Sequence, residues 1–268
     1  MGISDEATDA VRLAAADGVA VVTINRPKVR NAVDLATMRQ LADLFEQLEG
    51  RADVRAVLLT GSGGSFCAGA DLGAGVEEFA DPANAAAMME AIGRAITALV
   101  RSRLPYVAAV DGPAAGVGAS LAFACDLVVA SRPAYFLLPF TGIGLIPDGG
   151  ATSTVAASIG RARAMRMALR RERLSAPDAL AAGLIAAVCE PEELEATARA
   201  WAEELNNGPQ AAIALTKALV NEQTLGGLEH ALRRESQVQV ERLASADFRE
   251  GATAFLERRP AVYNRDTR

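Results

Sequence analysis

A single acid stands inside an otherwise uncharged stretch near the middle of the chain. Residues 135–155 read YFLLPFTGIGLIPDGGATSTV, and Asp148 is their only charged residue. Desolvation in an apolar setting raises the pKa of a carboxylate and makes it a better base for moving protons. The Pro-Asp-Gly-Gly sequence around it is also typical of a turn, and Asp is a favoured helix N-cap. The residues alone leave both interpretations open.

Two loops rich in Gly and Ala could support proton chemistry with backbone groups. They are GSFCAGADL (Gly64–Leu72) and DGPAAGVGAS (Asp111–Ser120), and each follows an expected buried strand. Small residues let a ligand approach the backbone and leave N–H groups free to point at an anion. Together the loops could offer two donors to one oxyanion, and losing one such donor costs about 3–4 kcal/mol of transition-state stabilisation. The alternative is that both loops are only tight turns between strand and helix.

A serine hydrolase is a competing hypothesis. The sequence GASLA (118–122) differs from the G-x-S-x-G nucleophile elbow by its last residue, and Ser120 follows a strand and opens a helix. The only histidine, His230, is far along the chain, so a serine hydrolase would have to bring it back to Ser120 or use a Lys instead. The segment GSGGSF lacks the third Gly of a dinucleotide-binding loop, and the chain has no G-K-[ST] phosphate loop.

Composition limits the class of protein. The 268 residues are 51% hydrophobic, which allows a large core, and the net charge of −6 argues against a nucleic-acid partner. Three widely spaced cysteines, Cys67, Cys125 and Cys189, give neither a disulfide framework nor a metal-ligand spacing. We therefore expect no metal and a cytoplasmic location. The acidic start does not resemble a signal peptide, and no apolar run reaches the ~18 residues of a membrane span, so we expect no membrane partner.

The elements that must position these residues alternate in type. Asp34 is the expected N-cap of a helix that ends at Gly50, and Ser175 is the expected N-cap of a helix that ends at Gly183. From residue 191 onward only helical segments are expected, so an α/β body precedes a helical tail. Apolar, β-branched runs predict strands at residues 19–24, 54–61, 105–110, 126–130, 135–138 and 185–188.

Several motifs, taken in order, resemble the enoyl-CoA hydratase/isomerase (crotonase) family. They span about residues 11–263 and read VAVVTINRPKVRNAV, VRAVLLTGSGGSFCAGADL, VAAVDGPAAGVGASLAFACDLVVA, IGLIPDGG and SADFREGATAFLERRPAVY. The resemblance implies an α/β fold, with a crotonase-type spiral of ββα units over residues 1–200 and a helical oligomerisation region over residues 201–268. It also implies a homotrimer or a hexamer of two trimers. The implied substrate is an acyl-CoA thioester, with coenzyme A as part of the substrate and no separate cofactor.

The resemblance further implies roles for individual residues. The backbone N–H groups of Ala70 and Val117 would form an oxyanion hole that holds an enolate at the thioester oxygen. Lys28, Arg30 and Ala68 would line the coenzyme A moiety. The acyl pocket would be formed by Phe136, Leu138, Phe140 and Ile143.

Two positions depart from the hydratase pattern of this family. The two Glu residues that a hydratase uses are replaced by Ser120 and Phe140. Addition of water needs a base and an acid, and these two side chains supply neither. The resemblance therefore favours the isomerase branch. There Asp148 would remove an α-proton from a 3-enoyl-CoA and return it at the γ-carbon to give the 2-trans-enoyl-CoA.

Other functions stay open at this point. The same fold could hydrate with a different acid, remove a halide, decarboxylate or hydrolyse a thioester. The chain could also be a CoA-binding member without catalytic activity.

Overall fold

The computed structural model describes residues 10–263, so the acidic first residues and the last five lie outside the described part. The larger sheet has the strand order β1-β2-β3-β4-β6-β9, and a smaller one has the order β5-β7-β8. In the larger sheet β1 and β2 are antiparallel, and the remaining neighbours are parallel. The strands are β1 (Val11–Ala16), β2 (Val19–Ile24), β3 (Ala56–Gly61), β4 (Tyr106–Val110), β5 (Pro113–Ala115), β6 (Leu127–Ser131), β7 (Tyr135–Leu137), β8 (Leu174–Ser175) and β9 (Ala187–Cys189).

The helices follow the strands and then dominate the tail. Among the described residues, no helix is both long and apolar enough to cross a membrane. The short 3-10 turns are η1 (Pro27–Val29), η2 (Leu72–Ala74), η3 (Phe140–Ile143) and η4 (Pro191–Glu193). The α-helices are α1 (Leu35–Glu49), α2 (Val76–Ala80), α3 (Pro82–Arg101), α4 (Val117–Ala124), α5 (Ala151–Arg170), α6 (Ala176–Ala181), α7 (Leu194–Asn207), α8 (Gln210–Leu225), α9 (Leu228–Leu243) and α10 (Ala246–Leu256).

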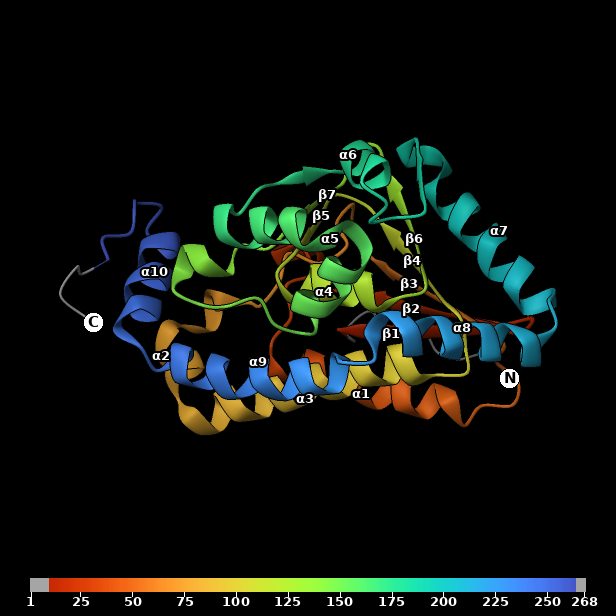
Figure 1. Cartoon of the computed structure of the whole chain (residues 1–268), viewed down its shortest axis with the longest axis horizontal. Coiled ribbons are helices and arrows are strands. Elements are labelled where there is room, and N and C mark those ends of the chain that lie inside the picture. The colour runs from red at the N-terminus through yellow and green to blue at the C-terminus, as the bar shows by residue number, and fades with distance from the viewer. Residues whose placement is uncertain (1–9, 264–268) are drawn as a thin grey trace.

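Helices cover both faces of the larger sheet. Figure 1 shows α1, α3 and α9 side by side below the sheet, while α7 runs along its other side. Leu194, Ala198 and Ala202 of α7 are buried against residues of β2, β3 and β4 such as Val107. The expected boundary at residue 200 therefore falls within a helix that packs on the sheet, and the helices after α7 form the tail.

The sequence missed three strands. The strands expected from composition overlap β2, β3, β4, β6, β7 and β9, whereas β1, β5 and β8 were not expected. Strand β1 exposes every second residue and is rich in Ala, so it lacks the apolar signature of a buried strand. Its turn into β2 is Asp17-Gly18, with φ of 51° and 87°. An Asp-Gly pair is typical of a tight hairpin, because both central residues need positive φ.

The two expected helix caps are confirmed. The Asp34 side chain accepts a hydrogen bond of 2.8 Å from the Thr37 N–H at the start of α1. The Ser175 hydroxyl accepts one of 3.2 Å from the Asp178 N–H at the start of α6. Both bonds satisfy N–H groups that have no partner within the helix.

Candidate active site

The two Gly- and Ala-rich loops run side by side in parallel register. Cys67 pairs with Ala114, and the flanking hydrogen bonds join Cys67 N–H to Pro113 O and Ala115 N–H to Cys67 O, each at 3.0 Å. Ala70 and Val117 each lie three residues beyond this pairing. The register therefore brings the two predicted oxyanion donors to the same place, although 47 positions separate them in the sequence.

Glycine makes the close approach of the two loops possible. Gly69 has φ of 104°, and a Cβ there would lie 3.0 Å from the carbonyl oxygen of Ala115. Gly116 has φ of 55°, and a Cβ there would lie 3.7 Å from the Cα of Gly69. A side chain at either position would strain the backbone and intrude between the loops.

Both predicted donors have free N–H groups. Val117 is the first residue of α4, where a helix has no internal acceptor for the N–H. The N–H groups of Ala68 and Asp71, on either side of Ala70, bond to Arg30 O and Val33 O. Within residues 10–263, no backbone acceptor meets the N–H of Ala70 or of Val117. Two unused donors at one place can hold a negatively charged oxygen.

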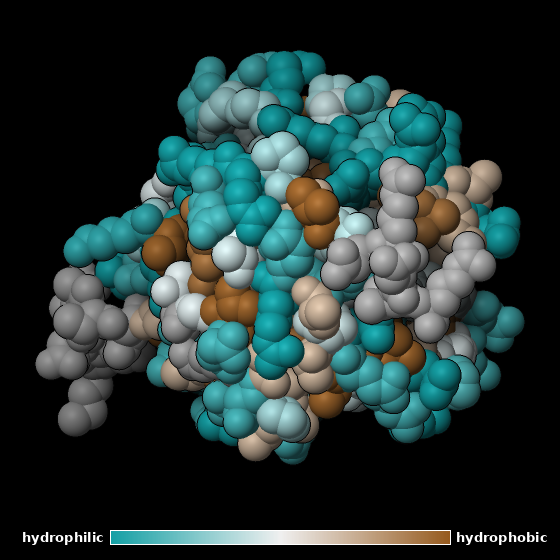
Figure 2. Space-filling view, turned by 90° about the vertical axis from the view of Figure 1, so that its left-hand side faces the viewer, coloured by the Kyte–Doolittle hydropathy of each residue, from teal (hydrophilic) through white to brown (hydrophobic). Residues whose placement is uncertain are grey.

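A cavity of about 150 Å³ lies at these donors and is mostly apolar. It reaches the end of the molecule formed by α2 and α10, where Figure 2 shows hydrophobic side chains between polar ones. Phe255 of α10 is 64% exposed and belongs to the lining, so the cavity opens there. The described lining residues are Ala68, Gly69, Ala70, Leu72, Phe79, Met88, Met89, Ile92, Gly116, Val117, Pro139, Phe140, Ile143, Leu145, Asp148, Gln239, Leu243, Phe248 and Phe255.

Asp148 is the one titratable side chain among these described lining residues. It is only 5% exposed, and its pKa is raised from 3.8 to about 7, chiefly by burial. The hydrogen bond from Gln239 opposes this rise in the pKa, and the nearby charge of Glu235 contributes to it. The Asp148 carboxyl group can therefore exchange a proton near neutral pH.

Gln239 of α9 determines which oxygen of Asp148 is free. Its side-chain N–H group donates to Asp148 Oδ2 at 2.7 Å and to Ile146 O at 2.9 Å. Its side-chain oxygen accepts from Ile146 N–H at 3.1 Å, which fixes the orientation of the amide. Asp148 Oδ1 is buried and has no hydrogen-bond partner among the described residues. Oδ1 is thus the oxygen of Asp148 that no described residue engages.

The interpretation of Asp148 as a helix cap is wrong. Helix α5 begins at Ala151, and its N-cap residue is Gly150, which has no side chain that could cap the helix. The buried carboxylate of Glu235, from α9, accepts the N–H groups of Gly150 at 2.7 Å and of Thr152 at 3.3 Å instead. Because Glu235 accepts the unpaired N–H groups at the N-terminus of α5, the Asp148 carboxylate is not needed as a cap.

Ser120 and Phe140 occupy the two positions where hydratases carry Glu, and both make other contacts here. The Ser120 hydroxyl donates to the carbonyl oxygen of Asp148 at 2.7 Å and so holds the backbone of the acid. His230 is exposed on α9, so the described residues bring no histidine to this buried hydroxyl. Phe140 lines the cavity, and its ring lies 3.8 Å from the Cβ position of Gly116. Neither the hydrolase triad nor the hydratase acid pair is present at this cavity.

The other predicted site residues divide into two groups. Ile143 and Phe140 line the cavity as expected. Phe136 and Leu138 do not: Phe136 is fully buried and packs against Phe123 with ring centroids 5.1 Å apart, and Leu138 is also in the core. Both side chains belong to the core around the cavity and not to its described lining. Alternation along β7 turns Phe136 to the core, and Leu138 follows directly after the strand. The apolar sequence pattern alone could not distinguish a core position from a cavity position.

The predicted coenzyme A residues lie beside the first Gly- and Ala-rich loop (Gly64–Leu72), which carries Ala70 and is called the oxyanion loop below. Ala68 donates its N–H to Arg30 O at 3.0 Å, and both Lys28 and Arg30 are exposed. Neither side chain forms an ion pair with another described residue. Arg26 ties this segment to the oxyanion loop through Asp71 at 2.9 Å. The two basic groups are therefore free to meet an anion near the cavity.

Sequence reasoning missed the contribution of the helical tail. Gln239 and Glu235 were not expected at the site, nor were Leu243, Phe248 and Phe255. A signal exists in the spacing of α9, where Leu228, Leu232, Glu235, Gln239 and Leu243 recur at three- and four-residue steps. Two polar residues inside an apolar stripe indicate buried hydrogen-bonding partners. No group of described His, Cys, Asp or Glu residues could hold a metal ion.

Comparison with known proteins shows the family of the chain. The family model described as Enoyl-CoA hydratase/isomerase matches residues 14–266. A protein of Rhodobacter capsulatus named probable enoyl-CoA hydratase is 41% identical over 250 residues, which are 93% of this chain and 96% of that protein. The 1,2-epoxyphenylacetyl-CoA isomerase of Escherichia coli is 40% identical over 249 residues, 90% of this chain and 93% of that protein. A crystal structure of an enoyl-CoA hydratase from Mycobacterium avium subsp. paratuberculosis superposes with a TM-score of 0.88 at 43% identity, covering 96% of this chain and 99% of that one.

Proposed function

Because the chain belongs to the enoyl-CoA hydratase/isomerase family, whose members act on acyl-CoA thioesters, we propose that it moves a double bond from Δ3 to Δ2 of an enoyl-CoA. Asp148 is the proton shuttle of this reaction. One observation carries the proposal: the cavity contains a single described titratable group, Asp148, beside two free N–H donors. An allylic isomerisation needs only one base that later acts as the acid.

The proposed reaction starts with the α-carbon of a 3-enoyl-CoA near Asp148 Oδ1. The α C–H bond breaks, the proton moves to Oδ1, and the electron pair delocalises over the thioester as a dienolate. The N–H groups of Ala70 and Val117 stabilise the negative charge that develops on the thioester oxygen. The γ-carbon then takes the proton back from Oδ1, which leaves the double bond at Δ2 and regenerates the carboxylate.

The pKa of Asp148 suits both halves of this reaction. A value of about 7 leaves the group partly ionised at neutral pH, so it can accept the first proton and release it again. Ordinary carboxylates have a pKa near 4 and are weaker bases. The fixed bond from Gln239 to Oδ2 supports Oδ1 as the proton-carrying atom.

Hydration has less support than isomerisation. Water addition requires an acid and a base at the same substrate, and the described lining offers one carboxyl group. Relatives named as hydratases and a relative named as an isomerase are similarly close to this chain, so the names alone do not choose between the reactions.

Binding of the coenzyme A moiety by Lys28 and Arg30 is part of the same proposal. Both basic side chains are exposed, Arg30 accepts the Ala68 N–H through its backbone carbonyl, and phosphate groups favour such cations. Assembly as a trimer or hexamer and a cytoplasmic location stay predictions. Exposed Leu215, Leu219 and Val220 on α8 support burial of that helix in an assembly.

Turnover of defined thioesters tests the proposal. Wild type and Asp148→Asn are assayed with 3-enoyl-CoAs, 2-enoyl-CoAs and 1,2-epoxyphenylacetyl-CoA. We expect wild type to isomerise 3-enoyl-CoA and Asp148→Asn to lose about 10²–10⁴-fold in kcat. Binding of a saturated acyl-CoA serves as the control, since it needs no proton transfer. Full isomerase turnover by Asp148→Asn contradicts the proposal, and an acyl-aspartyl adduct in mass spectrometry would identify a nucleophile instead of a shuttle.

A further inference from the structure

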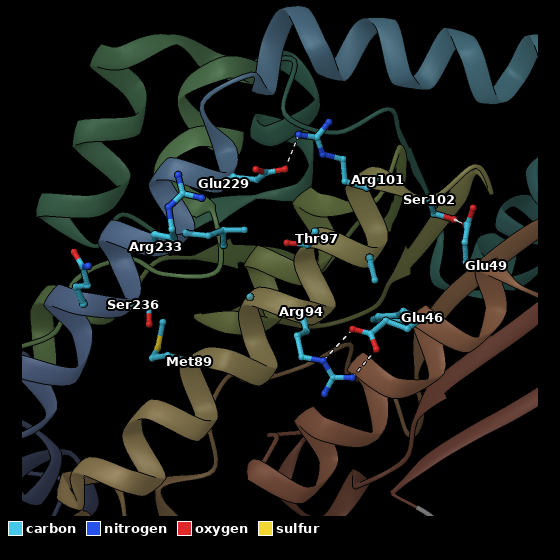
Figure 3. A pocket seen from close by; sticks show the side chains of 15 residues that line it. Glu46, Glu49, Met89, Arg94, Thr97, Arg101, Ser102, Glu229, Arg233 and Ser236 are labelled. Atoms are coloured by element: carbon cyan, nitrogen blue, oxygen red, sulfur yellow. Dashed lines mark hydrogen bonds and ion pairs between the residues drawn. The ribbon is translucent and has the colours of Figure 1, made fainter.

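A large groove lies directly behind the cavity. It has a volume of about 830 Å³ and is lined by α1, α3 and α9. Figure 3 shows Arg94 of α3 reaching to Glu46 of α1, and Arg101 of α3 paired with Glu229 of α9. These ion pairs lie at the rim of the groove. Apolar residues such as Phe45 and Leu232 contribute to the lining, so the groove could accept an apolar chain.

Met89 is common to the cavity and the groove. Along α3 the lining passes from Met88 in the cavity, through Met89 in both, to Gly93 in the groove. Along α9 it passes from Gln239 in the cavity to Ser236 in the groove. In Figure 3 the Met89 side chain lies between α3 and the Ser236 segment of α9. Met89 is only 4% exposed, and it lines both of these spaces, which follow each other along the two helices.

Gly93 leaves the groove open next to Met89. It lies one turn beyond Met89 on α3, and a Cβ at this position would meet no heavy atom within 4 Å. Gly inside a helix weakens the helix relative to Ala, and packing does not require it here. The absence of a side chain therefore adds to the space behind Met89.

We propose that Met89 is the end wall of the acyl cavity and limits the length of acyl chain that this protein binds. Shortening Met89 joins the cavity to the groove and admits longer chains. The proposal rests on the proposed function only for the identification of the cavity as the acyl site. The cavity of about 150 Å³ is smaller than the ~300–1,000 Å³ of pockets that bury drug-sized ligands, whereas the groove falls within that range. Wild type therefore binds short or compact acyl groups.

Binding of saturated acyl-CoAs tests the role of Met89. Affinities for chains of increasing length are measured by calorimetry, below the concentrations at which the ligands form micelles. Each buried methylene raises affinity about fourfold, so the length at which the gain stops reports the end of the cavity. We expect the gain to stop at a short chain in wild type and to continue for several more carbons in Met89→Ala.

Met88→Ala is the matched control. It removes the same side-chain atoms from the neighbouring residue, which lines the cavity but not the groove. We expect its length limit to move far less than that of Met89→Ala. The double variant Met89→Ala with Gly93→Leu fills the groove beside the opening, and we expect it to lose the gain for long chains. If Met89→Ala does not fold, Met89→Val removes fewer atoms and opens the same wall.

The outcomes separate this inference from the proposed function. Equal length limits in wild type and Met89→Ala overturn the inference, and so does an equal shift in Met88→Ala. They would indicate that the groove serves another occupant, such as a second copy of the chain. Saturated ligands need no turnover, so a Met89-dependent limit without isomerase activity overturns the proposed reaction alone. Failure of every acyl-CoA to bind overturns both.

Discussion

Gln239 donates a hydrogen bond of 2.7 Å to Oδ2 of Asp148, although the two residues are 91 positions apart in the sequence. The amide of Gln239 is held in one orientation by the N–H and C=O of Ile146. It can therefore present only its donor side to the carboxylate. This contact makes the helical tail part of the candidate active site and favours the ionised form of Asp148.

Removing this donor should shift the pH dependence of activity upward. Gln239→Met deletes the bond that lowers the pKa of Asp148, so that pKa rises further above 7. A hydrogen bond to a charged group contributes about 1.5–3 kcal/mol, which corresponds to about one to two pKa units. With the carboxylate as the proposed base, kcat/KM should increase with pH through this pKa. The pH profile of Gln239→Met should have its rising limb displaced upward.

The exposed residue Gln40 of α1 provides a matched control for that experiment. Gln40→Met makes the same change on a helix surface away from the cavity. The rising limb of its pH profile should lie at the same pH as that of wild type. An unchanged rising limb in Gln239→Met would show that Gln239 does not act on the proposed base, Asp148.

Neutralising Glu235 should shift the rising limb of the pH profile in the opposite direction. The Glu235 charge raises the pKa of Asp148, so Glu235→Gln lowers that pKa and moves the rising limb to lower pH. Glutamine keeps a side-chain oxygen that can accept from Gly150 N–H, which preserves the start of α5. The kcat/KM profile is the measurement. Shifts of the same sign in Gln239→Met and Glu235→Gln would contradict the electrostatic account.

Removing the N–H of Val117 should slow the reaction without unfolding the protein. Val117 is the first residue of α4, where Pro is well tolerated because its missing N–H is not needed by the helix. Val117→Pro therefore deletes one of the two proposed oxyanion donors, and we expect kcat to fall about 10²–10³-fold. Val117→Ala keeps the N–H and should retain most activity. Circular dichroism checks the fold of both variants. Comparable rates for the two variants would show that the Val117 N–H is not an oxyanion donor.

Burial of Asp148 should make the protein less stable as pH rises. Its pKa is raised from 3.8 to about 7 in the folded state, so the folded protein holds a proton that the unfolded chain releases. The associated stability is complete below about pH 4 and is lost as pH rises to about 7, by at most about 4 kcal/mol. Asp148→Asn does not titrate. Relative to wild type, its free energy of unfolding should therefore increase from pH 4 to pH 7.

Urea unfolding at one fixed protein concentration measures this difference. Asp111→Asn is a useful comparison, because Asp111 is a carboxylate that accepts hydrogen bonds from the Ser131 hydroxyl and the Gly112 N–H outside the cavity. It should not reproduce the pH trend of Asp148→Asn. Parallel curves for wild type and Asp148→Asn between pH 4 and pH 7 would contradict the raised pKa.

Much of the site could be predicted because its signals are local. The Gly-rich loops need their glycines for a close backbone approach, and Gly69 and Gly116 have the positive φ values that this requires. The fold class, which the comparisons support, followed from motifs in order along the chain. The acyl lining was predicted less well, because Phe136 and Phe140 have the same apolar chemistry while only Phe140 faces the cavity.

The sequence by itself determined the family, the α/β body with a helical tail, and the presence of one acid in an apolar segment. Whether that acid caps a helix was decided only by tertiary structure. The N–H of Gly150 at the start of α5 donates to the carboxylate of Glu235, which is 85 positions further along the chain. Local sequence defines which hydrogen bonds a segment needs, but any distant residue of suitable chemistry can supply them. Packing of α9 against α5 brings Glu235 to the helix N-terminus and Gln239 to one oxygen of Asp148, and so leaves the other oxygen free.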